Sequence, residues 1–486
     1  MPKLARAHAV LALTLACAAC TRDGSLVAAS KNLGVEDLTS VRFVGTGASF
    51  SVGQPYVAGQ EWPRVDVVGY TAEVDYASAS MRTDVTRQQP SPEPPGGGVR
   101  FAGQQRQVLL VSGASAWSQP PAAADGTQPA PQPQPAAAAE RTLQIWTTPH
   151  GFVKAAAEHE VEIERTAEGG SEVSFTLASG HRVSGTINAE NEVERVRTWL
   201  DNAVLGDMAV ETTYSEYQDF GGVHFPAHIR QTQGGHPSLD LTITAVEANP
   251  AVAITVPQEV PAFQPAPVQA TMDEVMDGVW YVRGGSHHSV AIEMSDHVVV
   301  VEGPQSEARG AAVIAAVQQA LPDKPIRYVV NTHVHFDHSG GLRPFVDAGA
   351  TVVTHESNKA FYEEAWAAPR TLGPDRLSQS GKAPTFQTVG DVGELTDGTR
   401  RIELYTIAEA PHNTGFLMVY LPRERILIQA DAYAPPADGA PAPAPTPNSI
   451  ALYNDVRRRG LDVRQILAIH GPRVATLADL RAAAGM

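Results

Sequence analysis

The segment NTHVHFDHSGG, residues 331–341, constrains this chain more than any other part of its sequence. It gathers three of the chain's 16 histidines, and one aspartate, within six positions: His333, His335, Asp337 and His338. A short apolar run precedes it, IRYVVN (326–331), which is typical of a buried strand. In an extended chain residues i and i+2 point the same way, so His333 and His335 face one side. Two imidazoles followed by a carboxylate and a third imidazole suit a divalent metal, Zn²⁺ above all.

The motif belongs to a C-terminal region, residues 270–486, in which predicted strands and helices alternate. The strand predicted from HVVVVEG (297–303) is followed by a helical pattern over residues 306–321, which Pro322 ends. This alternation continues to a last short strand, ILAIH (466–470), and predicts a layered α/β domain.

The preceding region, residues 38–260, reads as closely spaced strands separated by Gly-rich or polar breaks, the pattern of an antiparallel β domain. Residues 141–159 predict a helix within it. A Pro/Ala-rich stretch, residues 119–139, predicts a flexible insertion or linker. A second such stretch, residues 434–449, favours a disordered loop over a gating one.

The N-terminus predicts export. Lys3 and Arg6 precede an apolar stretch, AVLALTLACAAC (9–20), which is too short to span a bilayer. Its end resembles a lipoprotein signal box, in which Cys20 is acylated and tethers the mature protein to a membrane. Ordinary cleavage after ACA (16–18) is the alternative. Either route predicts a periplasmic or membrane-anchored protein. Cys17 and Cys20 are its two cysteines, both within the signal, so the mature chain has no structural disulfide.

The formal net charge of -17 argues against nucleic acid as a partner and leaves a small molecule as the expected substrate.

The motif THVHFDHSGG resembles the signature of the metallo-β-lactamase fold superfamily, which implies a four-layer αβ/βα sandwich for residues 270–486. Later ligands of that family match His412 before an apolar strand, Asp431 in RILIQADAY, and His470 in ILAIHG. The resemblance implies two divalent metal ions, most simply Zn²⁺. One ion is held by His333, His335 and His412. The second is held by Asp337, His338 and His470, and Asp431 bridges both. Pro411 departs from the glycine that often precedes the family's third histidine.

Such a site implies a hydrolase in which a bridging hydroxide attacks a small ester, lactone, thioester or amide, and Asp337 orients that hydroxide. The family's β-lactamases generally lack an aspartate at the bridging position, so Asp431 counts against a β-lactamase, which stays an alternative. Tyr433 matches a tyrosine that contacts the substrate in lactonases, although a packing role is equally consistent with the sequence. In GGSHHS (284–289), which resembles a loop at the rim of the metal site, His287 and His288 are expected in an exposed turn, with contact to the substrate as the alternative.

Residues 214–229, YSEYQDFGGVHFPAHI, loosely resemble bacterial lipoprotein-carrier-like domains, which implies a lipid ligand for the N-terminal β domain. The other alternative is therefore a periplasmic lipid-binding or carrier protein with a vestigial hydrolase domain.

Overall fold

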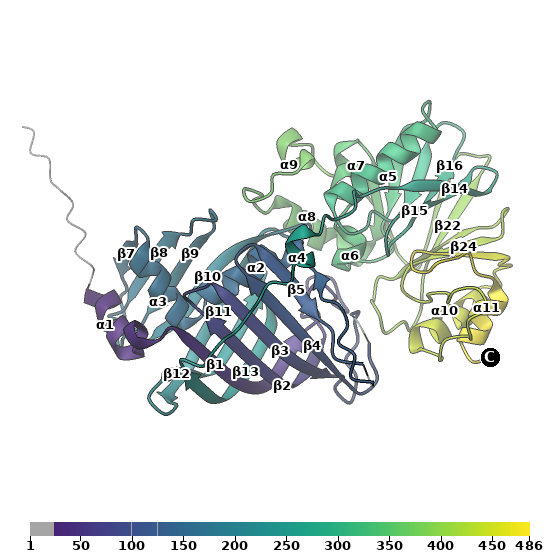
Figure 1. Ribbon diagram of the computed structural model, residues 1–486. Coiled ribbons are helices and arrows are strands. Elements are labelled where there is room, and N and C mark those ends of the chain that lie inside the picture. Colours follow the sequence, from purple (N-terminus) through teal and green to yellow (C-terminus); the bar gives the residue numbers. More distant parts are fainter. Residues whose placement is uncertain (1–23, 99, 124) are drawn as a thin grey trace, which may run out of the picture.

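The computed structural model describes residues 24–98, 100–123 and 125–486. The predicted export signal, residues 1–20 with Cys20, lies outside these residues. Figure 1 shows a broad curved sheet followed by a smaller layered α/β unit.

The N-terminal unit is built on one sheet of 13 strands, and every neighbouring pair in it is antiparallel. The strand order is β6-β5-β4-β3-β2-β1-β13-β12-β11-β10-β9-β8-β7. Sequence neighbours therefore pair, except that β6 and β7 lie at opposite edges of the sheet, and β1 also pairs with β13. The prediction of an antiparallel β domain is confirmed. The strands are β1 (Ser40–Phe50), β2 (Arg64–Asp75), β3 (Ser80–Gln88), β4 (Gln104–Ser112), β5 (Ser115–Gln119), β6 (Gln132–Pro133), β7 (Glu162–Arg165), β8 (Ser171–Thr176), β9 (Arg182–Ile187), β10 (Val193–Asn202), β11 (Gly206–Asp219), β12 (His224–Gln233) and β13 (His236–Ala248).

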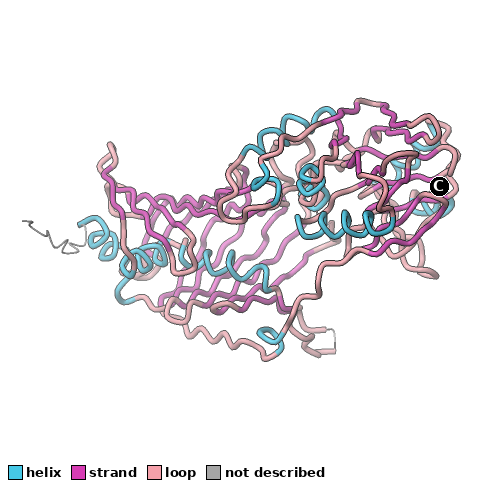
Figure 2. Tube along the Cα trace, turned by 90° about the horizontal axis from the view of Figure 1, so that it is seen from above, coloured by secondary structure: helices cyan, strands magenta, loops and turns pink. Residues whose placement is uncertain are grey.

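Helices α1 (Gly24–Leu33), α2 (Ala138–Trp146) and α3 (Pro149–Glu158) pack on this sheet (Figure 2). The helix expected over 141–159 is thus two helices. The second starts at Pro149, whose fixed φ suits the first helical position, and the Thr148 side chain accepts a hydrogen bond from the Gly151 N–H. Apolar side chains of α3, such as Phe152, join side chains of the sheet such as Phe43 and Phe225 in one buried core.

The Pro/Ala-rich stretch 119–139 is more ordered than a flexible linker. Its second part contains β6, the short 3₁₀ helix η2 (Pro135–Ala137) and the start of α2. Its first part folds back on itself, since the Gln128 side chain donates to the Pro120 carbonyl and the Gln119 side chain donates to the Pro129 carbonyl. Side-chain amides thus satisfy carbonyls that proline-rich backbone leaves unpaired.

The C-terminal unit contains two sheets. The first, in the order β14-β15-β16-β17-β18-β19-β20, is antiparallel up to β17 and parallel from there. The second, β21-β22-β23-β24-β25, is antiparallel except for β24 and β25. Their strands are β14 (Thr271–Met276), β15 (Val279–Arg283), β16 (Ser289–Glu293), β17 (Val298–Val301), β18 (Ile326–Val330), β19 (Thr351–His355), β20 (Phe386–Val389), β21 (Val392–Thr396), β22 (Arg401–Thr406), β23 (Leu417–Leu421), β24 (Ile426–Gln429) and β25 (Gln465–Ala468).

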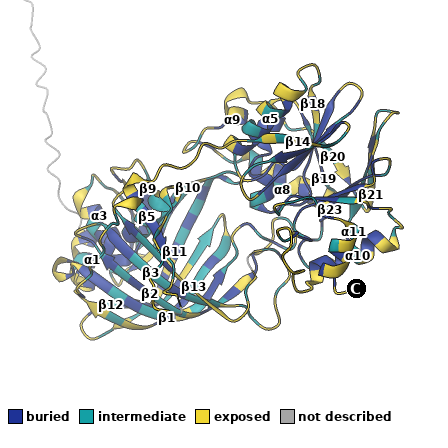
Figure 3. Cartoon of the chain, turned by 45° about the vertical axis from the view of Figure 1, so that its right-hand side comes forward, coloured by how far each residue is buried: buried dark blue, intermediate teal, exposed yellow. Residues whose placement is uncertain are grey.

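The two sheets pack face to face and helices cover both outer faces. Val299 and Val301 of β17 point into the core between the sheets, whereas Val298 and Val300 pack against helices on the outer side. A strand buried on both faces reads as an unbroken apolar run, as this VVVV does. Figure 3 shows the resulting interior in dark blue. The helical elements of this half and of the segment leading into it are α4 (Glu259–Ala262), α5 (Glu307–Ala320), α6 (Phe336–Ser339), α7 (Arg343–Asp347), η3 (Glu356–Asn358), α8 (Lys359–Ala367), α9 (Arg376–Ser380), α10 (Pro447–Arg458) and α11 (Leu477–Ala483).

None of the helices in the described part of the chain has both the length and the apolar character needed to cross a membrane.

The two units meet through the loop that follows β1, residues 51–63. In this loop the Gly53 carbonyl accepts from the Phe336 N–H at 3.1 Å, and the Tyr56 carbonyl accepts from the Thr414 N–H at 2.9 Å. A second contact is made by Arg370, whose buried guanidinium donates to three successive carbonyls of the β10–β11 turn, residues 202–204. Loop 51–63 thereby reaches the segment that carries the histidine motif.

Candidate metal centre

The histidine motif lies directly after β18, at the end of a parallel strand. The chain leaves the sheet at Asn331 and turns into α6 within a few residues. The side chains of His333, His335 and His338 are completely buried there. The carboxyl ends of neighbouring parallel strands meet at one edge of a sheet, which is where such folds build their sites.

Three residues from distant strands join the motif. His412 precedes β23, Asp431 follows β24 and His470 follows β25. The Nε2 atoms of His412 and His333 are 3.2 Å apart, as are those of His470 and His338. The fold thus brings together all seven side chains that the sequence singled out as ligands.

Asp431 lies between the two groups of histidines. Its Oδ2 is 3.1 Å from His412 Nε2 and 3.8 Å from His333 Nε2. Its Oδ1 is 2.8 Å from His338 Nε2 and 3.0 Å from His470 Nε2. One carboxylate oxygen therefore faces each group, which is the arrangement that a bridging ligand requires.

Two clusters result, in each of which four ligand atoms lie within 4.8 Å of one another. The first contains His333, His335, His412 and Asp431, and the second contains His287, Asp337, His338 and His470. Nitrogens that bind one tetrahedral Zn²⁺ at about 2.0–2.1 Å lie roughly 3.3 Å from each other. The 3.2 Å separations between facing imidazoles match that spacing.

Two buried atoms at the centre also call for a cation. His335 Nδ1 has no hydrogen-bond partner, and Asp431 Oδ1 makes no hydrogen bond of good geometry although His338 Nε2 lies 2.8 Å away. Both atoms are shielded from solvent. Buried polar atoms without partners are rare because each forfeits its interaction with water. A bound metal ion would satisfy both, so the residues present fit a metal centre.

The electrostatics favour the metal-binding forms of His333, His335 and Asp431, whereas the carboxylates of Asp431 and Glu302 outweigh burial and raise the pKa of His338. Burial, reinforced by the neighbouring histidines, lowers the pKa of His333 well below its ordinary value and that of His335 to about 3. Both imidazoles are therefore neutral near pH 7 and offer a lone pair. Burial raises the pKa of Asp431, but His338 and His412 outweigh it and lower that pKa well below the usual range, so Asp431 is an anion.

Hydrogen bonds at the outer nitrogens fix the orientation of four of the histidines. His335 Nε2 donates to the Pro55 carbonyl at 3.0 Å, and His470 Nδ1 donates to the Ser286 carbonyl at 2.9 Å. His338 Nδ1 is 3.0 Å from a carboxylate oxygen of Glu302, and His333 Nδ1 is 3.0 Å from the Thr332 hydroxyl. In each case the inner nitrogen is left facing the centre. Such outer partners set the tautomer and the basicity of a ligand.

Sequence reasoning missed three residues at this centre: Gln54, Pro55 and Glu302. Gln54 Nε2 donates to Asp337 Oδ1 at 2.8 Å. The Glu302 carboxylate, which contacts His338, also accepts a hydrogen bond from the Thr332 N–H at 2.7 Å. An acidic residue at the end of the VVVV strand is the signal from which both contacts could have been suspected. Gln54 and Pro55 carry no such signal.

The expectation of an exposed turn for His287 and His288 is wrong, because both side chains are largely buried. His287 Nε2 lies 3.1 Å from Asp337 Oδ2, which places it in the second cluster. His288 Nε2 instead donates to the Gly471 carbonyl at 3.0 Å.

Tyr433 occupies a different environment. Its side chain is buried in the hydrophobic core to which both C-terminal sheets contribute, and it does not line the cavity described below. Its backbone exchanges two hydrogen bonds with the Gln429 side chain. Contact of Tyr433 with a substrate stays a prediction. The stretch after it, residues 434–446, has no regular structure, and α10 starts at Pro447.

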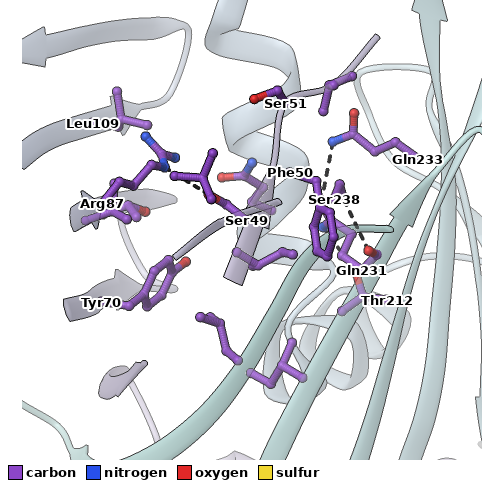
Figure 4. A pocket seen from close by; sticks show the side chains of 18 of the residues that line it. Ser49, Phe50, Ser51, Tyr70, Arg87, Leu109, Thr212, Gln231, Gln233 and Ser238 are labelled. Carbon is purple, nitrogen blue, oxygen red and sulfur yellow. Dashed lines mark hydrogen bonds between the residues drawn. The ribbon is translucent and has the colours of Figure 1, made fainter. Parts of the chain in front are cut away.

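The centre opens onto a cavity of about 710 Å³, whose lining includes Asp337, His412, Asp431 and His470. The same cavity is lined by side chains of the N-terminal sheet, among them Ser49, Tyr70, Arg87 and Gln231 (Figure 4). Ligand sites in proteins commonly have this volume.

Two curated proteins are similar to part of this chain. The chain is 28% identical over 174 residues to 2,4-dinitroanisole O-demethylase subunit alpha of Nocardioides sp. (strain JS1661), a match that covers 35% of this chain and 48% of the relative. It is 30% identical over 163 residues to the beta subunit, covering 33% of this chain and 47% of that subunit. The chain thus spans about half the length of these relatives.

Solved structures with a similar fold include a metallo-beta-lactamase from Pontibacter korlensis, at 17% identity and a TM-score of 0.35, covering 45% of this chain and 98% of that one. The mono-zinc form of FIM-1 from Pseudomonas aeruginosa aligns at 18% identity and a TM-score of 0.34, over 46% of this chain and 96% of that one. Residues 282–463 match the family model of the metallo-beta-lactamase superfamily. The resemblance drawn from the sequence is confirmed, and the C-terminal half of this chain is a metallo-β-lactamase superfamily domain.

Proposed function

We propose that the chain is an exported hydrolase that uses two divalent metal ions to cleave a small ester, lactone, thioester or amide. The observation that carries this proposal is the convergence of His412, Asp431 and His470 on the 333–338 motif, with buried His335 Nδ1 left unpartnered. A protein whose site had decayed would have no reason to keep an unpaired buried atom, which weighs against a carrier with a vestigial domain.

Ions bound in the two clusters would activate a water molecule and polarise the substrate's carbonyl or phosphoryl oxygen. The nitrogen-rich donor set favours Zn²⁺. His333, His335 and His412 would hold one ion, and Asp337, His338 and His470 the other, with Asp431 between them.

The protein's own groups prepare the site for hydrolysis. The Asp337 carboxylate is oriented by Gln54 on one oxygen and by His287 on the other. Burial raises its pKa, but the hydrogen bond from His287 and the charge of His338 outweigh that and lower it. Asp337 is thus an anion that can accept a hydrogen bond from attacking water at the edge of the cavity.

The demethylase names of the two relatives motivate a second candidate, cleavage of an aryl methyl ether. This candidate rests on sequence similarity over about half of each relative, so 2,4-dinitroanisole belongs among the test substrates. Penicillin belongs there as well, because the β-lactamase alternative predicts its turnover. Export, and a membrane tether through Cys20, are tested separately by fractionation of cells that produce wild-type protein or a Cys20→Ser variant.

The decisive experiment measures the metal content of the purified full chain and its rate on a panel of esters, lactones, thioesters and phosphodiesters. We expect about two ions per chain. His335→Ala and Asp431→Ala should each reduce kcat/KM by more than about a hundredfold, the upper range for outer-shell changes. His181→Ala, at a partly exposed histidine outside both clusters, is the control. A folded chain that binds no metal would refute the proposal.

A further inference from the structure

The cavity at the metal centre extends far into the N-terminal sheet. At one end lie the metal-cluster residues Asp337, Asp431 and His470, and at the other lie Thr147 and Pro149, where α2 meets α3. Its side walls are formed by strands that lie on both sides of the paired strands β1 and β13. A site confined to the reacting bond would not require a cavity that continues from the metal centre into the sheet of another domain.

The lining of the chamber changes in character along its length. Ser49, Arg87 and Gln231 lie near the ends of β1, β3 and β12, at the side from which loop 51–63 reaches the metal centre. Register places them together, because Ser49 pairs with Leu239, and Leu239 pairs with Gln231. Further along these strands and the neighbouring β11 and β13 the lining is mainly apolar and aromatic, although Thr83, Thr147 and Thr148 also contribute to it. The apolar and aromatic residues are Phe43, Met81, Val85, Tyr214, Phe225, Ile229 and Leu241. Along the cavity, from the metal-cluster residues to α3, the lining therefore forms a reaction centre, then a polar collar of Ser49, Arg87 and Gln231, and then an apolar chamber.

Arg87 is the charged group of the collar. Its guanidinium donates to the Ser49 hydroxyl at 3.1 Å and to the Gln107 side-chain oxygen at 2.9 Å, and both partners are neutral. Within the described residues, no carboxylate lies within 4.0 Å of it. Figure 4 shows Arg87 beside Ser49 and Tyr70 at the cavity. A guanidinium with donors to spare favours a ligand that places acceptor oxygens nearby.

We propose that the chamber binds the long apolar chain of an amphiphilic substrate, an ester, thioester or lactone of a fatty acid, whose reacting carbonyl lies at the metal centre. The collar binds the oxygens next to the reacting bond, and the sheet domain selects for chain length. This inference deepens the proposed function and rests on it.

Burial of apolar surface sets the expected magnitude. Each methylene moved from water into an apolar site strengthens binding about fourfold. A chain that fills even part of the chamber should therefore bind at least about a hundredfold more tightly than one that ends at the collar.

The first test measures binding alone, by isothermal titration of the full chain with dodecanoate and with butyrate. Both carry the same carboxylate, so the difference reports the chain. We expect dodecanoate to bind at least a hundredfold more tightly. Equal affinities would overturn the inference.

Variants locate the bound chain. Leu239→Trp fills the chamber from β13, whereas Thr242→Trp adds the same ring to the exposed outer face of that strand. We expect the first to weaken dodecanoate binding at least tenfold and the second to leave it unchanged. Leu109→Trp, on β4, serves as a second blocking variant if Leu239→Trp fails to fold. Equal effects of the chamber and outer-face variants would place the chain elsewhere.

Kinetics separate this inference from the function on which it rests. On p-nitrophenyl esters from acetate to dodecanoate, kcat/KM should rise with chain length in the wild type and level off in Leu239→Trp. Arg87→Gln should lower kcat/KM for every chain length. Hydrolysis at a rate that does not depend on chain length would refute chain binding in the chamber and leave the hydrolase proposal intact. Tight dodecanoate binding without hydrolysis of any ester would support chain binding in the chamber and refute the hydrolase proposal.

Discussion

The backbone carbonyl of Pro55, in the N-terminal half of the chain, accepts a hydrogen bond from Nε2 of the buried His335 at 3.0 Å. One residue earlier, the Gln54 side chain donates to Asp337 at 2.8 Å. Each of the two ligand clusters is therefore oriented in part by the loop that follows β1. The metal centre is a shared product of both halves of the chain, and experiments on it need the full chain.

Removing the Gln54 side chain should weaken the second cluster selectively. In Gln54→Ala, Asp337 keeps its contact with His287 but loses one of its two orienting hydrogen bonds. We expect a 10- to 100-fold loss of affinity for one of two metal equivalents, as outer-shell changes typically cause. Competition with a fluorescent chelator measures it. Gln60→Ala, at an exposed position of the same loop, is the control, and equal affinities in the two variants would show that the contact has no role.

Glu302→Gln should disturb His338 without changing side-chain volume. The Glu302 carboxylate accepts from both the Thr332 N–H and His338 Nδ1. An amide that still accepts from Thr332 turns its NH₂ towards His338, which favours the tautomer with the proton on the inner nitrogen. We expect metal affinity to fall about 10- to 100-fold while the fold persists. Circular dichroism and chelator competition report the two quantities.

Glu424→Gln provides a matched comparison, because Glu424 is a buried carboxylate of the same half that pairs with Arg400 rather than with a ligand. It should lower stability and leave metal affinity intact. If Glu302→Gln behaves in the same way, orientation of His338 is not its role.

His150 should make folding sensitive to acid. Burial lowers its pKa from 6.5 to about 4 in the folded chain, although its hydrogen bond to the Leu33 carbonyl opposes this. Above pH 6.5 the ring is neutral in both states, and its contribution to stability is complete. As the pH falls from 6.5 to 4, the unfolded chain binds the proton first, and roughly 3 kcal/mol of unfolding free energy is lost.

Urea denaturation at several pH values tests this prediction. His150→Gln should flatten the dependence of unfolding free energy on pH between 6.5 and 4, relative to the wild type. His181→Gln, at a partly exposed histidine, should not. Parallel curves for all three proteins would contradict the assignment.

Arg370→Ala should loosen the junction between the two halves. Its guanidinium is buried and donates to the carbonyls of Asn202, Ala203 and Val204 at 2.9–3.2 Å. Charged hydrogen bonds of this kind contribute more than neutral ones, and loss of the donor leaves the carbonyls unpaired. We expect a loss of about 2–3 kcal/mol in unfolding free energy and separate thermal transitions for the two halves. Arg376→Ala, at an exposed arginine, should keep the wild-type transition.

The sequence carries the local half of this architecture. Closely spaced strands predict the antiparallel sheet, and the apolar run HVVVVEG predicts a strand. The spacing His333, His335, Asp337, His338 predicts a metal site because those ligands lie within one turn of chain. Gln54 and Pro55 could not be predicted, since their roles depend on how two domains pack. His287 was misassigned for a related reason: its burial comes from His338 and His470, which are distant in sequence.

The pairing of β1 with β13 has a consequence for how the protein is made. Ser49 pairs with Leu239, which is synthesised some 190 residues later, so that side of β1 stays unpaired until then. Until then the strand presents an open edge, the kind of surface on which nascent chains associate with each other. Contacts so distant along the chain also form slowly. Gln54 and Pro55 come directly after β1 and form part of the wall of the metal site. The late pairing of β1 with β13 therefore determines when this wall is in place for the ligands that are synthesised last.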